Sequence, residues 1–268
     1  MVRSGCMRLA AGLVLALTAL VVSPQAKAQT EVDLALVLAV DISFSMDTEE
    51  QALQREGFAQ AFRSPLVHEA IRGGLLGRIA VTYMEWAGSA DQKVIVPWTI
   101  LDNSESLMAF ADRIASTPLR RAQRTSISSA IDFSARLFDE LDVTPTRRVI
   151  DVSGDGPNNQ GRMVEQARDD TLAKGIIING LPIMLHKPGY LDIPDLDIYY
   201  RDCVIGGQGA FMVPVRERDQ FVNAIKTKIL LEVANLTPRQ DFRIERIQAP
   251  PRANCLTGEM QWRDRWNN

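Results

Sequence analysis

The fold is decided by one stretch of the sequence, Val32-Asp33-Leu34-Ala35-Leu36-Val37-Leu38-Ala39-Val40-Asp41-Ile42-Ser43-Phe44-Ser45. Its apolar part is continuous and of strand length, which predicts a buried parallel strand that is covered on both faces. Asp41, Ser43 and Ser45 follow at alternating positions, where the chain leaves this strand. Because ligands of open α/β sheets bind outside the carboxyl ends of the strands, these oxygens stand where a site is expected. A carboxylate with two hydroxyls suits Mg²⁺ or Mn²⁺ better than Zn²⁺.

Two later segments add to this motif. Asp-x-Ser-x-Ser after an apolar strand is the first signature of the von Willebrand factor A family, whose metal ion-dependent adhesion site takes a Thr and an Asp from two later loops. The segment that begins Arg124-Thr125-Ser126 resembles the family's Thr loop and the helix after it. The segment that ends in Asp155-Gly156 resembles its fourth strand. With three motifs in order, the chain resembles this family over roughly residues 31–234, and looks most like an exported bacterial branch of unknown function.

The resemblance implies a metal site and a use for it. The residues it implies are the oxygen-bearing side chains of the three motifs: Asp41, Ser43, Ser45, Thr125 and Asp155. The hydroxyls would supply neutral oxygens to a Mg²⁺ or Mn²⁺ ion, and the carboxylates would hold its water ligands or bind it directly. The ion would then accept an Asp or Glu carboxylate of a partner protein, which is how this family uses the site. The alternative is that Asp41 and the serines only cap the following helix.

Two features near the motifs bear on partner binding. Phe44 stands where many members of the family have Gly, so its ring either contacts a partner or packs on its own loop. Arg120, Arg121 and Arg124 precede Thr125. These arginines either form a solvated loop or steer an acidic partner, while weakening cation binding by repulsion. Phe44, Arg121 and Arg124 are therefore candidate partner contacts.

Alternating strand and helix patterns predict a three-layer, doubly wound α/β domain over residues 31–234. Its sheet has six strands and is mostly parallel, with one antiparallel edge strand that Pro97 assigns to residues 94–99. The expected strands are 32–40, 78–86, 94–99, 149–153, 176–185 and 210–215. The expected helices are 48–62, 65–71, 102 or 104 to 115, 126–141, 160–174 and 218–234. Residues 235–268 show little periodicity and are expected to pack back on this domain as an extension.

Residues 1–28 show the pattern of a secretory signal peptide. Arg3 and Arg8 precede the uncharged apolar stretch 9–22, and Ala26-Lys27-Ala28 offers small residues for cleavage after Ala28. A retained membrane anchor is the alternative, but this apolar stretch is short for a span of roughly 20 residues. We therefore expect a periplasmic or secreted protein that does not span the membrane after cleavage.

The charge of the chain bears on its class of partner, and its cysteines bear on a possible disulfide. The 268-residue chain has 30 basic and 33 acidic residues, and removal of the first 28 residues leaves 27 and 33. Net negative charge argues against a nucleic-acid partner, which would need a basic surface. Cys203 and Cys255 remain after cleavage. In an oxidising compartment they form one disulfide, the alternative being two buried thiols.

Enzyme motifs are missing from the sequence. It has no G-x-S-x-G, no P-loop and no H-E-x-x-H, and we predict that the protein is not an enzyme. His186 follows the fifth expected strand, where a lone histidine is more often a surface residue than a base. One alternative is a metal-assisted hydrolase or phosphotransferase, although a phosphotransferase would want a second Asp where Ser43 stands. The other is a periplasmic solute-binding protein that uses the same cleft, although no second lobe is visible in the sequence.

Overall fold

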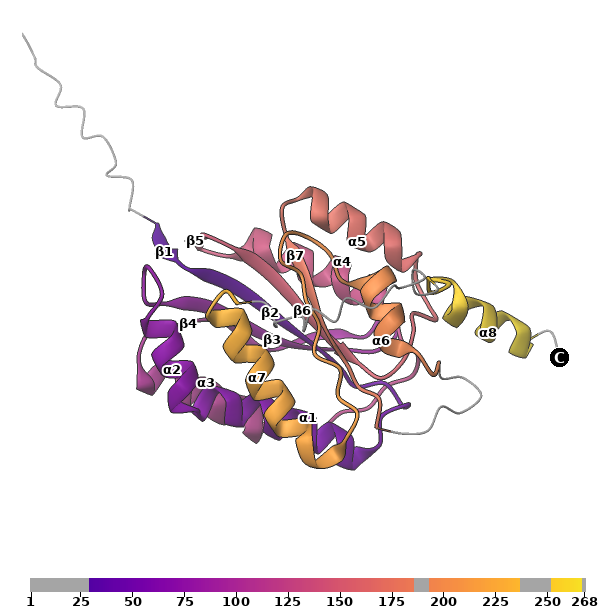
Figure 1. Ribbon diagram of the computed structural model, residues 1–268, viewed down its shortest axis with the longest axis horizontal. Helices are drawn as coiled ribbons and strands as arrows, with labels where there is room; N and C mark the ends of the chain where they lie inside the picture. Colours follow the sequence, from indigo (N-terminus) through magenta and orange to yellow (C-terminus); the bar gives the residue numbers. More distant parts are fainter. Residues whose placement is uncertain (1–28, 186–192, 237–251, 267–268) are drawn as a thin grey trace, which may run out of the picture.

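A five-stranded sheet in the order β4-β3-β2-β6-β7 forms the centre of the molecule (Figure 1). The structure is a computed structural model that describes residues 29–185, 193–236 and 252–266, so residues 1–28 and His186 lie outside the described residues. Neighbouring strands are parallel except β3 and β4, which makes β4 an antiparallel edge strand, as predicted. The strands are β2 Leu34–Asp41, β3 Ile79–Trp86, β4 Gln92–Leu101, β6 Arg148–Gly154 and β7 Ile177–Pro182.

Helices cover both faces of this sheet (Figure 1). The helices of one layer share an apolar core with one face; they are α1 Thr48–Arg63, α2 Pro65–Arg72, α3 Ser104–Ser116 and α7 Phe221–Val233. Those of the other layer share a second core with the opposite face; they are α4 Ile127–Leu137, α5 Val164–Ala173 and α6 Leu196–Tyr199. Two cores divided by a mostly parallel sheet confirm the three-layer α/β fold predicted from the sequence.

Strand β2 shows why its sequence has to be apolar without interruption. All of its residues are buried; the three leucines and Val40 lie in one core, and the two alanines and Val37 lie in the other. Successive side chains of a strand point to opposite faces, so a strand that is covered on both sides needs an apolar residue at every position. β2 pairs with β3 on one side and with β6 on the other. This central strand carries Asp41 to the carboxyl edge of the sheet.

The predicted sixth strand is wrong. Residues 210–215 run beside β7 but make only isolated bridges to it. Val213 and Val215 donate to the Gly180 and Pro182 carbonyls, but Pro182 has no backbone N–H to return a bond, so a continuous ladder cannot form there. Two short strands that were not predicted, β1 Thr30–Val32 and β5 Val143–Pro145, form a separate parallel pair.

The loop that carries the first motif is held at both ends. It leaves β2 after Asp41 and ends at helix α1, which begins with the capping residue Asp47. Asp47 Oδ1 accepts the Glu50 N–H at 2.7 Å, and Glu50 Oε2 accepts the Asp47 N–H at 2.9 Å. This capping box satisfies two backbone donors of the first helical turn and fixes where the loop returns to regular structure.

The C-terminal extension contains a helix that the sequence analysis missed, α8 Thr257–Trp266 (Figure 1). A disulfide joins Cys255, just before α8, to Cys203 in the π-helical turn Tyr200–Val204. The domain boundary at residue 234 stays a prediction. Throughout the described ranges, every helix is too short or too polar to cross a lipid bilayer.

Candidate metal site

A chain of hydrogen bonds links the first and third motifs at the carboxyl edge of the sheet. Asp41 Oδ1 accepts the Ser43 N–H at 2.7 Å, and Ser43 Oγ lies 2.7 Å from Ser45 Oγ. Ser45 Oγ donates to Asp155 Oδ1 at 2.6 Å. Asp155 follows β6, the parallel neighbour of β2, so both carboxylates leave the sheet at the same edge. The structure therefore brings together the side chains of Asp41, Ser43, Ser45 and Asp155.

Thr125 reaches the same edge through the second motif. Its N–H donates to Asn159 Oδ1 at 2.9 Å, and its carbonyl accepts the Asn159 N–H at 2.8 Å. A Cβ atom placed on Gly156 would lie 3.9 Å from Thr125 Oγ1, so the Thr loop packs directly on the loop after Asp155. Helix α4 then starts at once, with Ser126 as its N-cap. All five residues that the resemblance implied lie at one sheet edge, Asp41 as the last residue of β2 and the others in loops, and their role as metal ligands stays a prediction.

Asp41 is the electrostatic centre of this group of residues. It is fully buried, and its Oδ2 has no hydrogen-bond partner among the described residues. Burial raises its pKa to about 7, although the backbone N–H groups of Ser43 and Asp155 act in the opposite direction. The end of β6 approaches this oxygen closely, since a Cβ atom on Gly154 would lie 2.8 Å from Oδ2. Burying a carboxylate oxygen without a hydrogen-bond donor or a cation costs free energy, and a bound divalent cation would reduce this cost.

The donor set fits a hard cation. Carboxylates and neutral hydroxyls are the ligands that Mg²⁺ and Mn²⁺ accept. In the described part of the chain, no three His, Cys, Asp or Glu side chains gather as they would around a zinc ion. The site residues thus offer oxygen only, and they include just two carboxylates.

The arginines of the Thr loop have partners within the chain. Arg121 Nη2 donates to the carbonyl oxygens of Phe44 at 2.9 Å and Met46 at 2.7 Å, so it braces the first site loop. Arg124 stacks on the Trp262 ring, 3.6 Å from its centroid. Arg120 forms an ion pair with Asp91 at 2.9 Å.

Phe44, in contrast, is 52% exposed, and the Arg121 guanidinium lies 5.0 Å from its ring centroid. Of the candidate partner contacts, Phe44 therefore offers open apolar surface, while Arg121 and Arg124 hold loops in place.

Sequence reasoning missed the residues that support the site from behind. Asn158 is fully buried and its Oδ1 accepts the Ser128 N–H at 3.0 Å, which ties the loop after Asp155 to α4. Tyr200 is also fully buried, with its hydroxyl 3.5 Å from the Gly154 carbonyl. Burial and the nearby carboxylates of Asp41 and Asp155 raise the Tyr200 pKa above its usual value. The Asn158-Asn159 pair after Asp155 is a turn signal that could have been noticed; nothing in the sequence indicates Tyr200.

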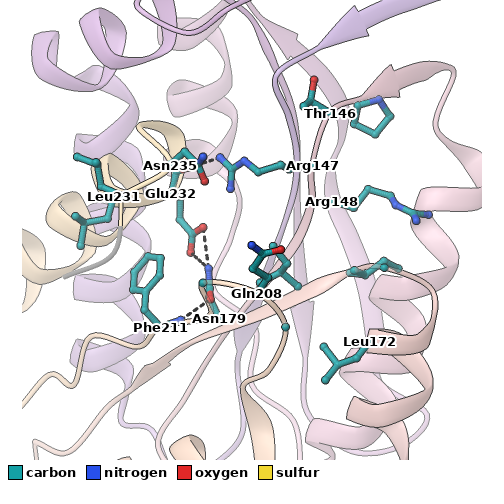
Figure 2. A pocket seen from close by; sticks show the side chains of 17 residues that line it. Thr146, Arg147, Arg148, Leu172, Asn179, Gln208, Phe211, Leu231, Glu232 and Asn235 are labelled. Atoms are coloured by element: carbon teal, nitrogen blue, oxygen red, sulfur yellow. Dashed lines mark hydrogen bonds between the residues drawn. The ribbon is translucent and has the colours of Figure 1, made fainter. Parts of the chain in front are cut away.

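A second buried group of charges lies between β6, β7 and α7. Lys228 Nζ is 2.9 Å from Asp151 Oδ1 and 2.7 Å from Glu232 Oε1, and all three side chains are buried. Asn179 Nδ2 donates to Glu232 at 2.8 Å (Figure 2). Burial raises the Asp151 pKa to about 6, while the Lys228 cation opposes this shift. This ion pair was not predicted, because an Asp in a strand and a Lys in a helix carry no signal that they meet.

A cavity of about 740 Å³ lies at the opposite edge of the sheet, beside the starts of β6 and β7 (Figure 2). Arg147 and Arg148 line it, but Figure 2 shows their side chains extending in different directions. Arg147 donates to the carbonyl of Glu232 at 2.9 Å, and Arg148 donates to the carbonyl of Lys174. Each arginine thus satisfies a carbonyl at the carboxyl end of a helix, and the two do not converge on a common ligand position.

The fold and the site loops define a class, the proteins with a von Willebrand factor A fold. Solved structures with this fold include proximal thread matrix protein 1 from the mussel byssus with a zinc-occupied MIDAS motif, which is 13% identical with a TM-score of 0.57 over 76% of this chain and 49% of that one. The pilus adhesin SpaC from Lactobacillus rhamnosus GG is 10% identical, with a TM-score of 0.59 over 78% of this chain and 32% of the adhesin. A von Willebrand factor type A protein from Catenulispora acidiphila is 12% identical, with a TM-score of 0.51 over 75% and 43%.

This chain spans less than half of each of these three chains, and at such identities the likeness shows the fold alone. The resemblance predicted from the three motifs is confirmed at that level. The chain belongs to the family described as Protein of unknown function (DUF1194), which matches residues 31–237. No curated protein sequence matches it.

Proposed function

We propose that this protein binds a divalent cation, Mg²⁺ or Mn²⁺, through Asp41, Ser43, Ser45, Thr125 and Asp155, and that the cation binds a protein partner. The observation that carries the proposal is Asp41 Oδ2, a buried carboxylate oxygen that has no partner among the described residues. Hydroxyls and a second carboxylate, the other ligands that a hard cation needs, lie in the same group of loops.

The partner is proposed to offer an Asp or Glu side chain. When bound, the cation supplies a positive centre that neutral hydroxyls leave only partly compensated. A carboxylate gains most at such a centre, because it is charged and can displace a water ligand. The exposed Phe44 ring stands beside this position and offers apolar contact area. Two structures of similar fold support a binding role by their descriptions, one as a pilus adhesin and one with a zinc-occupied MIDAS motif.

We propose binding rather than catalysis, in the periplasm or outside the cell. A hydrolase would need a general base near the cation, and histidine is the residue most often used. His68, the histidine among the described residues, lies on α2, beyond the far end of α1, where its Nε2 contacts the Phe62 carbonyl at 2.8 Å. Export is the reading of residues 1–28 and agrees with the disulfide between Cys203 and Cys255, a bond typical of oxidising compartments.

Calorimetric titration with Mn²⁺ and with Mg²⁺ tests the cation site. We expect the wild type to bind, and Asp41→Asn, which removes the charge at nearly constant volume, to lose binding. Asp139→Asn is the matched control, because Asp139 is exposed in the 3₁₀ turn after α4. Equal heats for wild type and Asp41→Asn would reject the site.

The partner part of the proposal has its own test. Proteins that bind the immobilised wild type in the presence of Mn²⁺ should be released by a chelator, and should not bind immobilised Asp41→Asn. Substitution of the essential acidic residue of such a partner by its amide should abolish the complex. A complex that survives both the chelator and these substitutions would contradict the proposal.

A further inference from the structure

Helix α8 contacts the Thr loop immediately before its site residue. The Arg124 guanidinium lies 3.6 Å from the centroid of the Trp262 ring of α8. Arg124 itself has a φ of 75°, a left-handed conformation that is unfavourable for a residue with a Cβ atom. The next residue is Thr125, so the stacking on Trp262 holds the turn that orients the Thr125 backbone.

The first turn of α8 also contacts the loop after Asp155. Asn158 Nδ2 donates to Glu259 Oε1 at 2.7 Å. A Cβ atom on Gly258 would overlap the backbone carbonyl of Asn158, so only glycine permits this close approach. Because Asn158 Oδ1 also accepts the Ser128 N–H, this one buried side chain connects α8 with the loop after Asp155 and with the first turn of α4, which follows the Thr loop.

The disulfide holds the start of α8 in place. Cys255 lies two residues before the helix and is bonded to Cys203, which is fully buried. Cys203 belongs to the same helical turn as Tyr200, whose hydroxyl lies beneath the Gly154 carbonyl. In α8 itself only Gly258 is buried among the residues with described side chains, 257–264. The position of the helix therefore depends on the disulfide and on its few contacts with the site loops.

We propose that α8 is a clamp on the metal site, and that the Cys203–Cys255 disulfide closes it. The inference rests on the proposed cation binding and adds its regulation by the thiol–disulfide state. A dithiol reductant transfers two electrons and two protons to the sulfur–sulfur bond, which leaves a thiol on each cysteine and a disulfide on the reductant. Without the bond, α8 leaves Arg124 and Asn158, and the loops of Thr125 and Asp155 lose the arrangement that binds the cation. Residues that support ligands from outside typically change metal affinity by about 10- to 100-fold.

Mn²⁺ calorimetry on the full chain tests the clamp. We expect protein reduced with dithiothreitol to bind Mn²⁺ at least about tenfold more weakly than oxidised protein. Gly258→Val and Trp262→Ala keep both cysteines and should show the same loss while oxidised, so the outcome does not depend on a variant without the disulfide. Arg263→Gln is the matched control, since Arg263 is an exposed neighbour of Trp262, and it should bind as the wild type does.

Hydrogen exchange without metal tests the clamp independently of the cation. In oxidised protein the backbone amides of residues 124–129 and 155–160 should exchange slowly, and reduction or Gly258→Val should accelerate them while the amides of β2 stay protected. Equal Mn²⁺ affinity of oxidised and reduced protein, or exchange in these loops that reduction does not change, would overturn the clamp. If neither form binds Mn²⁺, the proposed cation site fails and the exchange measurement alone decides on the clamp.

Discussion

Asp41 of β2 and Asp151 of β6 are buried aspartates on neighbouring parallel strands. They differ in whether another side chain compensates the charge of the carboxylate. Both side chains are almost completely buried, and burial raises the pKa of Asp41 to about 7 and of Asp151 to about 6. Asp151 has Lys228 Nζ at 2.9 Å. Among the described residues, Asp41 has no ion pair and its Oδ2 has no donor. The chain thus supplies the countercharge of Asp151 from its own helix α7, whereas the described residues supply none to Asp41; the proposed cation would take that place.

The largest effect is expected when the internal countercharge is removed. Lys228→Met should lower the free energy of unfolding by about 3–5 kcal/mol, because it leaves Asp151 and Glu232 buried without a cation. Lys226→Met, two residues earlier on α7, should change it by less than about 0.5 kcal/mol. Urea unfolding measures both. A loss below about 1 kcal/mol for Lys228→Met would mean that Asp151 needs no countercharge, and the comparison with Asp41 would lose its basis.

The pH dependence of stability in the cation-free protein should reveal how much free energy the ionised, buried Asp41 carboxylate costs. Its pKa is about 7 in the folded protein against an ordinary value of 3.8, so the folded state binds this proton more tightly than the unfolded state. Stability therefore falls as the pH rises from about 4 to about 7, by up to about 1.4 kcal/mol for each unit of the pKa difference, or about 4 kcal/mol in all.

Asp41→Asn should lack this loss, and its advantage over the wild type should grow across that pH range. For Asp151 the corresponding window ends near pH 6. Urea unfolding in the presence of a chelator measures both effects. An unchanged pH profile of Asp41→Asn would show that another group already compensates the Asp41 charge.

A bound cation should offset the free-energy cost of the buried Asp41 carboxylate, but not that of Asp151. At a free Mn²⁺ concentration of about 100 times its dissociation constant, the wild type should gain about 2.7 kcal/mol in stability. Asp41→Asn should gain nothing, whereas Asp151→Asn should keep the gain although its starting stability differs. Thermal unfolding with and without Mn²⁺ gives the result. A cation response that disappears in Asp151→Asn but persists in Asp41→Asn would reverse the comparison.

The smallest effect is expected at the buried Tyr200 hydroxyl, beside the Gly154 carbonyl at the end of β6. Tyr200→Phe should lower the free energy of unfolding by less than about 1 kcal/mol, because the hydroxyl lies 3.5 Å from its acceptor, the Gly154 carbonyl, at the limit of a hydrogen bond. Mn²⁺ affinity should stay the same. A loss above about 2 kcal/mol would indicate that Tyr200 serves as the internal partner of Asp41.

The sequence predicts what depends on local pattern. The apolar run 32–40 predicts the central strand, and its alternation with helical segments predicts the layers. The motifs predict that Asp41, Thr125 and Asp155 lie together at one edge of the sheet, because the carboxyl ends of neighbouring parallel strands meet there. The edge position of β4 follows from a single residue with a strong local preference, Pro97.

What the sequence does not predict depends on contacts between distant residues. From the sequence, Lys228 would be expected on the solvent-exposed side of a helix. Only the packing of α7 on β6 makes it a buried countercharge. The strand predicted at 210–215 fails because Pro182, on the neighbouring strand, removes a donor that the segment needs. Helix α8 was not predicted because it has no apolar stripe with helical periodicity. A disulfide, a close glycine contact and a stacked arginine hold it in place, rather than packing against a core.

The segment 210–215 has a consequence for association with other chains. Although it is no regular strand, it bonds with backbone groups on the outer side of β7, among them the N–H and carbonyl of Gly180. At the other border, β4 carries Pro97, which cannot donate, and the charged Lys93. Open borders of this kind are where foreign strands add and aggregates begin, and both of these are blunted. Both borders of the central sheet are therefore poor templates for the addition of a strand from another chain.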